Sequence, residues 1–309
     1  MSQPKTWADK RYYSLNYYLK KHFGNKVYKL SLNGGMTCPN RDGTLGSSGC
    51  IFCSEGGSGD FSSPATLSIT DQITAAKLKV KQKISSNQYI AYFQAFTNTY
   101  ADVNYLRKIY YEAISHPDII ALSIATRPDC LDDDIIELLN ELNQIKPVFI
   151  ELGLQTVSEK TATLIRRGYS LSCFKNAVYK LHEIGIEIVV HVILGLPFET
   201  KEDMLHTISV VCSLPINGIK LQLLHILKNT DLALLMNTFH ILTLEEYIDI
   251  VITCIEHIPE HIVIHRITGD GPKQLLLAPL WSSNKKNVLN QINKAFLTKD
   301  TWQGKYYQP

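Results

Sequence analysis

Three cysteines are the residues in this sequence most able to do chemistry. Cys38, Cys50 and Cys53 lie in the segment CPNRDGTLGSSGCIFC, which also contains three glycines. A glycine-rich loop lets the backbone wrap around a compact metal centre, and a CxxC pair directs two thiolates to the same centre. The loop therefore predicts a metal site with three cysteine ligands.

The number of ligands indicates which metal site this is. A structural zinc site normally has four protein ligands, whereas a [4Fe-4S] cluster held by three cysteines leaves one iron open for a cofactor. We therefore favour an iron–sulfur cluster. A zinc site completed by a histidine or a distant cysteine is the alternative.

The other cysteines have simpler interpretations. Cys212 and Cys254 lie in apolar helical patterns and are expected to be small core residues, while Cys130 is a weaker candidate for a functional thiol. Seven unevenly spaced cysteines, with no export signal at the start of the sequence, disfavour a disulfide framework. We expect a cytoplasmic protein, and no apolar run has the length of a membrane span.

The elements that must position these groups follow from the apolar pattern. Short runs rich in Val, Ile and Phe alternate with amphipathic segments that have helix signals at their ends, such as Thr200 with Asp203, Thr243 with Glu246, and Gly185. The runs are residues 27–32, 89–96, 119–125, 148–154, 186–194, 219–227 and 262–267, and the helical segments include residues 158–167 and 200–214. This alternation predicts an α/β fold with parallel strands, closed or partly closed into a barrel.

Polar residues gather where the predicted strands end, which is where such folds place their chemistry. The strand ends carry TNT at residues 97–99, TRPD at 126–129, GLPFE at 195–199 and HRITGDG at 265–271. We divide the chain into a basic and aromatic N-terminal extension (1–26), the barrel (27–240) and a C-terminal extension (241–309) packed on the barrel at the substrate side. The net charge of +2 does not by itself indicate a nucleic acid partner.

In its motifs the sequence resembles the radical S-adenosylmethionine (SAM) superfamily. Within it, the gap of eleven residues after Cys38 and the run GSSGCIFC resemble the YtqA and YhcC family, whose core is similar to that of the Elongator catalytic subunit. The resemblance covers most of the chain through SLNGGMTCPNRDG, YFQAFTNTYA, ATRPDCL, ELGLQT, RRGYS, HVILGLPFET, LHILKNT and HRITGDGP. It implies a partial (β/α)6 TIM-type barrel with the cluster at its mouth.

The resemblance also implies the cofactors and their chemistry. Cys38, Cys50 and Cys53 would hold a [4Fe-4S] cluster whose open iron chelates SAM. An electron from a donor such as flavodoxin or ferredoxin would then break a carbon–sulfur bond and give a 5′-deoxyadenosyl radical, which abstracts hydrogen from the substrate.

Further cofactor contacts are implied residue by residue. The matching positions are Ala95, Phe96 and Thr97 for the cofactor's amino group, Gln155 and Arg167 for its polar groups and carboxylate, His191 for ribose, and Gly195, Leu196 and Pro197 for adenine. The alternative for Arg167 is a cation on a helix surface, and for His191 a core histidine. Thr126 or Arg127 would replace an acidic contact that some relatives carry after the third strand.

Two segments look specific to this family, and they are expected on the substrate side. Their candidate catalytic or substrate-binding residues are Lys220, Gln222, His225, His265 and Arg266. The alternative is that the histidines and Gln222 are buried polar groups that only make hydrogen bonds.

The resemblance implies a substrate class as well. Members of the family are linked to modification of the wobble uridine of tRNA, by loss of a carboxymethyl group from a carboxymethylaminomethyl side chain. Two alternatives stay open: a radical SAM enzyme acting on a small molecule such as a porphyrin precursor, and a structural zinc site in an RNA-binding module.

Overall fold

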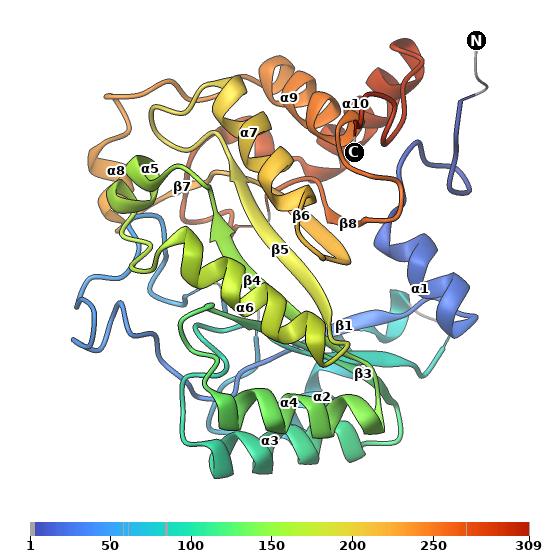
Figure 1. The fold of residues 1–309 in the computed structure, drawn as a ribbon, viewed down its shortest axis with the longest axis vertical. Helices are drawn as coiled ribbons and strands as arrows, with labels where there is room; N and C mark the ends of the chain where they lie inside the picture. The colour runs from blue at the N-terminus through green and yellow to red at the C-terminus, as the bar shows by residue number, and fades with distance from the viewer. Residues whose placement is uncertain (1–3, 58, 61, 84–85, 270, 309) are drawn as a thin grey trace.

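A curled sheet of parallel strands forms the centre of the protein (Figure 1). The structure, a computed structural model, describes residues 4–57, 59–60, 62–83, 86–269 and 271–308. The sheet runs in the order β1 (Tyr28–Leu32), β2 (Tyr89–Phe93), β3 (Ile119–Thr126), β4 (Val148–Gln155), β5 (Glu187–Leu194), β6 (Gly218–Leu223) and β8 (Val263–Arg266). Every pairing in it is parallel, and the sheet forms a half-barrel. The predicted partial barrel is confirmed.

Helices follow the strands and cover the outer face of the sheet (Figure 1). They are α2 (Ile69–Val80), α3 (Val103–Ser115), α4 (Asp133–Ile145), α5 (Glu159–Leu164), α6 (Leu171–Glu183) and α7 (Lys201–Cys212). In α4 the buried residues Ile135, Leu138, Leu139 and Leu142 recur every three or four positions and form a single apolar stripe. None of the helices in the described ranges is long and apolar enough to cross a membrane.

The predicted helix signals have the expected geometry. Thr200 and Asp203 form a capping box at the start of α7, in which each side chain accepts a hydrogen bond from the other residue's backbone amide. Thr243 and Glu246 do the same at the start of α9 (Leu244–Glu256). Gly185, with a φ of 68°, follows the end of α6.

Two predicted elements differ from the structure. The helix predicted over residues 158–167 ends at Leu164, because the chain then turns through the left-handed region at Arg166 and Gly168. The strand predicted over residues 219–227 breaks after Leu223, and the short β7 (Ile226–Leu227) pairs antiparallel with β9 (Leu276–Ala278) instead. His225 therefore lies in a bend at the mouth of the half-barrel, between two strands.

The two ends of the chain pack against β8 and α9. The N-terminal helix α1 (Leu15–Phe23) packs beside β8, where Ser14 forms a bridge with Ile264 (Figure 1). The C-terminal helix α10 (Lys285–Thr298) packs on α9. Beyond it Gln303 is fully buried: its amide donates to the carbonyls of Pro259 and Ile262 at 2.7 and 2.8 Å, and its carbonyl accepts from the Tyr13 amide at 2.8 Å.

Gln303 therefore joins both ends of the chain to the loop before β8, and its removal tests this. We expect Gln303→Ala to lower the free energy of unfolding by about 3 kcal/mol, because buried backbone groups lose their partners. Urea unfolding followed by circular dichroism measures the change. Gln308→Ala, at an exposed position near the same terminus, is the control and should leave the stability within about 0.5 kcal/mol of the wild type. Equal stability of the two variants would contradict this role.

Candidate active site

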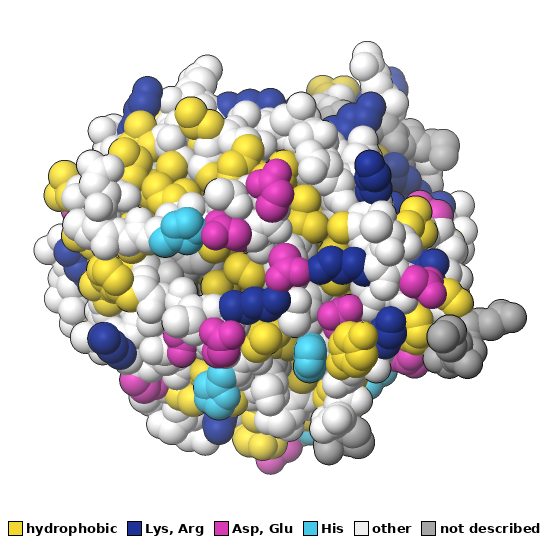
Figure 2. Space-filling model, turned by 90° about the horizontal axis from the view of Figure 1, so that it is seen from above, with side chains coloured by type: hydrophobic (Ala, Val, Ile, Leu, Met, Phe, Trp, Pro, Cys, Tyr) yellow, Lys and Arg dark blue, Asp and Glu magenta, His cyan; other side chains and the backbone are white. Residues whose placement is uncertain are grey.

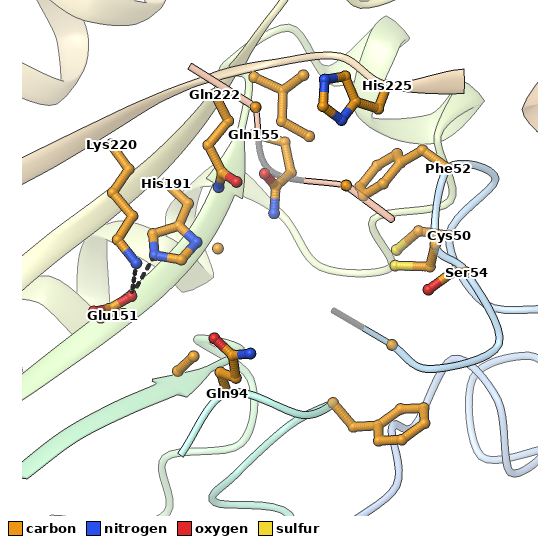
Figure 3. Close-up of a pocket in the computed structure, with 18 of the residues that line it drawn as sticks. Cys50, Phe52, Ser54, Gln94, Glu151, Gln155, His191, Lys220, Gln222 and His225 are labelled. Carbon is orange, nitrogen blue, oxygen red and sulfur yellow. Dashed lines mark hydrogen bonds and ion pairs between the residues drawn. The ribbon is translucent and has the colours of Figure 1, made fainter. Parts of the chain in front are cut away.

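A cavity of about 570 Å³ occupies the interior of the half-barrel and opens at the carboxyl ends of the strands. The cysteine loop lines one end of it, and inward-facing side chains of the sheet line the other (Figure 3). Its volume is in the range of small-molecule and cofactor sites. Most of the candidate residues predicted from the sequence lie on its wall.

The three clustered cysteines lie together at one end of this cavity. Cys38, Cys50 and Cys53 are all half-buried and line its wall beside Phe52. The Cys53 thiol is hydrogen-bonded to Cys50 and lowers the pKa of Cys50 to about 7, with further contributions from the amide of Asn40 and from nearby arginines. The site therefore favours thiolate at Cys50, the form that binds metal.

Polar contacts hold the cysteine loop against the turn that follows α5. The Asn40 amide donates to the carbonyls of Arg166 at 2.6 Å and Arg167 at 3.3 Å, and it lies 3.5 Å from the Cys50 sulfur. Gly168 is required in this turn, because a Cβ there would lie 2.7 Å from the side-chain oxygen of Asn40 and its φ is 84°. The loop is thus fixed by residues from a distant part of the sequence.

Three cysteines are the ligand set of a [4Fe-4S] cluster that leaves one iron open. In the described part of the chain, no group of three or more His, Cys, Asp or Glu side chains is arranged to hold one metal ion. In a [4Fe-4S] cluster each cysteine binds a different iron, so the three thiolates are spaced around the cluster and do not converge on one ion. Cys38, Cys50 and Cys53 all line the same cavity.

Two strand ends beside the cysteines adopt unusual backbone conformations. Phe96, after β2, has a φ of 59°, and Gln155, at the end of β4, has a φ of 71°. Side chains other than glycine rarely adopt this region, and such strain gathers at functional sites. Gly57 of the cysteine loop packs on Phe96 so closely that a Cβ there would lie 2.3 Å from the ring. Both strand ends line the cavity.

The other predicted cofactor-binding residues lie partly beside the cysteine loop and partly away from the large cavity. Ala95 and Thr97 are buried, and the amide of Thr97 donates to the carbonyl of Thr37, which ties this strand end to the cysteine loop. Among the described residues that line the large cavity, Gly195, Leu196 and Pro197 do not occur. Gly195 instead faces a small apolar pocket, where Leu242 packs over it.

Arg167 lies inside the protein and not on a helix surface. Its guanidinium donates to the carbonyls of Thr156 at 2.7 Å and Tyr169 at 2.9 Å, and pairs with Glu159 at 3.0 Å. It is only 2% exposed. These bonds fix the turn that carries Gly168, so the observed contacts of Arg167 are structural. The alternative of a surface cation is wrong, because the chain turns inward after α5.

At the other end of the cavity, five polar side chains surround the carboxylate of a sixth residue, Glu151. We call them the Glu151 layer: Lys29, Tyr92, Ser123, Glu151, His191 and Lys220, one from each of the strands β1 to β6. Glu151 accepts hydrogen bonds from Ser123 at 2.8 Å, Tyr92 at 2.9 Å and both lysines, and His191 lies 2.8 Å from it. Figure 3 shows the contacts of Lys220 and His191 with Glu151.

Burial and the charges in this layer determine the protonation states of its side chains. Burial opposes ionisation of Glu151, but Lys220, Lys29 and His191 outweigh burial and hold its pKa well below the usual value. Burial lowers the pKa of Lys220 to about 7, aided by Lys29 and Arg266 and opposed by Glu151. Burial also lowers the pKa of His191 to about 4, so this histidine is neutral at pH 7.

The remaining substrate-side candidates surround the same cavity. Gln222, His225, His265 and Arg266 all line its wall, the last two from β8. The pKa of His265 is well below its usual value, first because it is buried and next because Lys29 is near. Cys130 lies outside this wall; burial raises its pKa to about 12, which makes it an unreactive thiol.

The centre of the Glu151 layer was not predicted from the sequence. Glu151, Lys29 and Tyr92 were read as parts of apolar strands or motifs, although His191 and Lys220 were singled out. A charged residue inside an otherwise apolar strand, as in VFIELGL and VYKLSL, was the available signal, because a buried charge needs a partner.

The contacts of Asn40 give a test of the cysteine loop. We expect Asn40→Ala to weaken iron binding roughly tenfold, because the loop loses the bonds that fix Cys50. Iron and acid-labile sulfide per chain, measured after anaerobic reconstitution with limiting iron, report the effect. Asn104→Ala, at an exposed position on α3, is the control. Full iron content in Asn40→Ala would contradict the proposed role of these bonds.

Comparisons with known proteins agree with the geometry. Residues 38–211 match the model of the Radical SAM superfamily, and residues 216–297 match that of the Radical_SAM C-terminal domain. The chain is 44% identical over 307 residues to uncharacterized protein YtqA of Bacillus subtilis (strain 168), covering 99% of this chain and 95% of that protein. It is 36% identical over 279 residues to protein YhcC of Escherichia coli (strain K12), covering 89% of each.

Two more distant matches are a tRNA-modifying enzyme, over part of the chain, and a solved structure with the same fold. A tRNA-2-methylthio-N(6)-dimethylallyladenosine synthase of Fusobacterium nucleatum is 30% identical over 122 residues, which is 39% of this chain and 28% of that protein. The solved structure of archaeal Methanocaldococcus infernus Elp3 has the same fold, with a TM-score of 0.69 at 16% identity, over 90% of this chain and 64% of that one. The resemblance to the YtqA and YhcC family and to the Elongator core is confirmed, and the chain belongs to the radical SAM superfamily, whose enzymes use a [4Fe-4S] cluster and SAM.

Proposed function

We propose that this radical SAM enzyme modifies tRNA, removing the carboxymethyl group from the carboxymethylaminomethyl side chain of wobble uridine. The observation that carries the proposal is the chemistry of the cavity wall, which is cationic and rich in amides. A base with an anionic side chain needs such a wall, whereas a largely apolar ligand does not. The resemblance of the whole chain to the YtqA and YhcC family supports the same substrate class.

Cys38, Cys50 and Cys53 are proposed to hold the cluster at the mouth of the cavity. With SAM bound at its open iron, the cluster supplies a 5′-deoxyadenosyl radical for hydrogen abstraction. The chain's own part is to fix this loop through Asn40 and to present Phe96 and Gln155 beside it. Of the predicted cofactor contacts, Phe96, Thr97, Gln155, Arg167 and His191 line the cavity and keep their proposed roles, whereas Ala95, Gly195, Leu196 and Pro197 are not among its described lining residues.

The charge of the cavity wall favours an anionic ligand. Among the described residues that line the cavity, six are cationic and two are acidic. The cations are Lys29, Arg41, Arg127, Arg167, Lys220 and Arg266, and the acids are Asp60 and Glu151. Part of this charge is compensated locally, because Arg127 pairs with Asp129 and Arg167 with Glu159. The Glu151 layer keeps two lysines for one carboxylate.

Glutamine side chains line the cavity between the cysteines and the Glu151 layer. Gln94, Gln155 and Gln222 come from the ends of β2, β4 and β6, and Figure 3 shows them around the space between Cys50 and Lys220. An amide both donates and accepts hydrogen bonds, as the edge of a uracil base does. Gln94 and Gln222 are therefore the proposed contacts to the base.

The charges of the outer surface contribute little evidence for a tRNA partner. On the face that Figure 2 shows, Lys and Arg side chains are mixed with Asp and Glu. Lys201 and Lys299 both pair with Asp249 at 2.6 Å. Basic residues of the termini are paired too, such as Arg11 with Asp300 at 3.4 Å. The proposal rests instead on the cavity and on the partial match to a protein named as a tRNA-modifying synthase.

Membership of the superfamily also bears on the metal, the electron donor and the location of this protein. The zinc alternative is overturned, because the chain matches the Radical SAM superfamily over residues 38–211. We propose a flavodoxin or ferredoxin as the donor of the electron that the cluster needs, and the reducing cytoplasm as the location, since thiols stay available to the cluster there. A small-molecule substrate, such as a porphyrin precursor, becomes an outcome of the following test.

The test is a nucleoside profile of tRNA. tRNA that carries 5-carboxymethylaminomethyluridine is incubated anaerobically with reconstituted, reduced protein and SAM, then digested and analysed by mass spectrometry. We expect this nucleoside to decrease and 5-aminomethyluridine to increase, only when SAM is present. Unchanged tRNA, together with abundant 5′-deoxyadenosine formed in the presence of another metabolite, would overturn the proposal.

Matched cysteine variants test the cluster ligands separately. Cys53→Ala should abolish both iron binding and conversion of the tRNA, because the cluster loses one of three ligands. Cys173→Ala, at a half-buried cysteine of α6 that is not on the described cavity wall, should leave both unchanged. Full iron content in Cys53→Ala would refute the assignment of the ligands.

A further inference from the structure

The Glu151 layer carries more positive than negative charge, although it is buried. Lys29 and Lys220 share the Glu151 carboxylate, and the guanidinium of Arg266 lines the same end of the cavity. Glu151 is 1% exposed and Lys220 is 5% exposed. Buried cations are expensive unless anions compensate them, so an added anion would find a strongly favourable site here.

The geometry of the layer also leaves a donor for such an anion. An ammonium group has three N–H donors. Within the described residues, Lys220 donates to Glu151 and, at 3.2 Å, to the Tyr92 hydroxyl. Its nitrogen also lies 4.9 Å from the centre of the Tyr92 ring, so Tyr92 and Glu151 fix its position at the cavity wall. The third donor is available to a ligand.

We propose that Lys220, positioned by Glu151 and assisted by Arg266, binds the carboxylate of the substrate at this end of the cavity. The inference deepens the proposed function and rests on it, because that function supplies a substrate with a carboxylate. Lys220 would be a residue that determines specificity: it distinguishes the carboxymethylaminomethyl side chain from the aminomethyl product, which lacks the carboxylate.

The cofactor is a second possible source of a carboxylate. In Figure 3, Lys220, His191 and Glu151 lie on one side of the cavity and Cys50 and Ser54 on the other, with the glutamines between. The resemblance to the superfamily places the amino and carboxylate groups of SAM on the open iron, at the cysteine side. The two carboxylates would therefore lie at opposite ends, and the experiment separates them.

Equilibrium binding of two RNAs tests the inference. The reconstituted protein, with SAM and without a reductant, is titrated with anticodon stem-loops carrying either 5-carboxymethylaminomethyluridine or 5-aminomethyluridine. We expect the wild-type protein to prefer the first at least about tenfold, as for a charged hydrogen bond. Lys220→Met should remove this preference, and Lys220→Arg should keep most of it. The affinity for SAM should stay unchanged in both variants.

Each outcome decides one question. Equal affinity of the wild-type protein for the two RNAs, or a full preference in Lys220→Met, overturns the carboxylate site, even if the tRNA is modified as proposed. Reduced SAM affinity with an unchanged RNA preference would assign Lys220 to the cofactor. If wild-type protein leaves tRNA unmodified, the proposed function fails and the inference fails with it. Should Lys220→Met not fold, Arg266→Gln must reduce the same preference.

The pH dependence of the preference gives a second test. Lys220 faces Lys29, Tyr92, Glu151, His191 and Arg266, and its pKa is about 7. Glu151 stays ionised and His191, with a pKa of about 4, stays neutral over the neutral range. Since only the protonated ammonium attracts the carboxylate, the preference should fall at least tenfold between about pH 6 and about pH 9. A preference independent of pH in the wild-type protein would contradict the inference.

Discussion

The buried carboxylate of Glu151 is the interaction on which the interior of this half-barrel depends. Six neighbouring strands each contribute one side chain to it or to its partners, in the place where a closed barrel would pack apolar side chains. Two lysines could not be buried so close together without this carboxylate. The layer therefore links β1 to β6 through their side chains. It also keeps this end of the cavity polar.

Much of the fold was predictable because its signals are local. The apolar runs, the capping boxes at Thr200 and Thr243, and the stop at Gly185 depend only on residues close in sequence, and the structure has them as predicted. The break after Leu223 was not predictable from periodicity, because LLHIL continues the apolar pattern. It arises from pairing of β7 with β9, whose sequence lies some fifty residues further on.

The candidate site was predictable only in part, for the same reason. The cysteine loop is one contiguous segment, so its residue types and spacing identify it. Arg167 was placed on a helix surface as one alternative, whereas the left-handed residues Arg166 and Gly168 turn it inward, and only the fold shows which carbonyls it meets. Glu151 is apparent as a site residue only once the curvature of the sheet brings Lys29 and Lys220 to its two oxygens.

The two ends of the cavity thus have different origins in the sequence. The cluster end comes from a single loop held by Asn40 and by the turn at Gly168, so a chain can keep it while the rest of the barrel changes. The opposite end is assembled from single positions on six strands, each of which can change from charged to apolar with little effect on the local strand pattern. Under the proposed function, the residues that hold the cluster and those that bind the substrate therefore come from separate parts of the sequence.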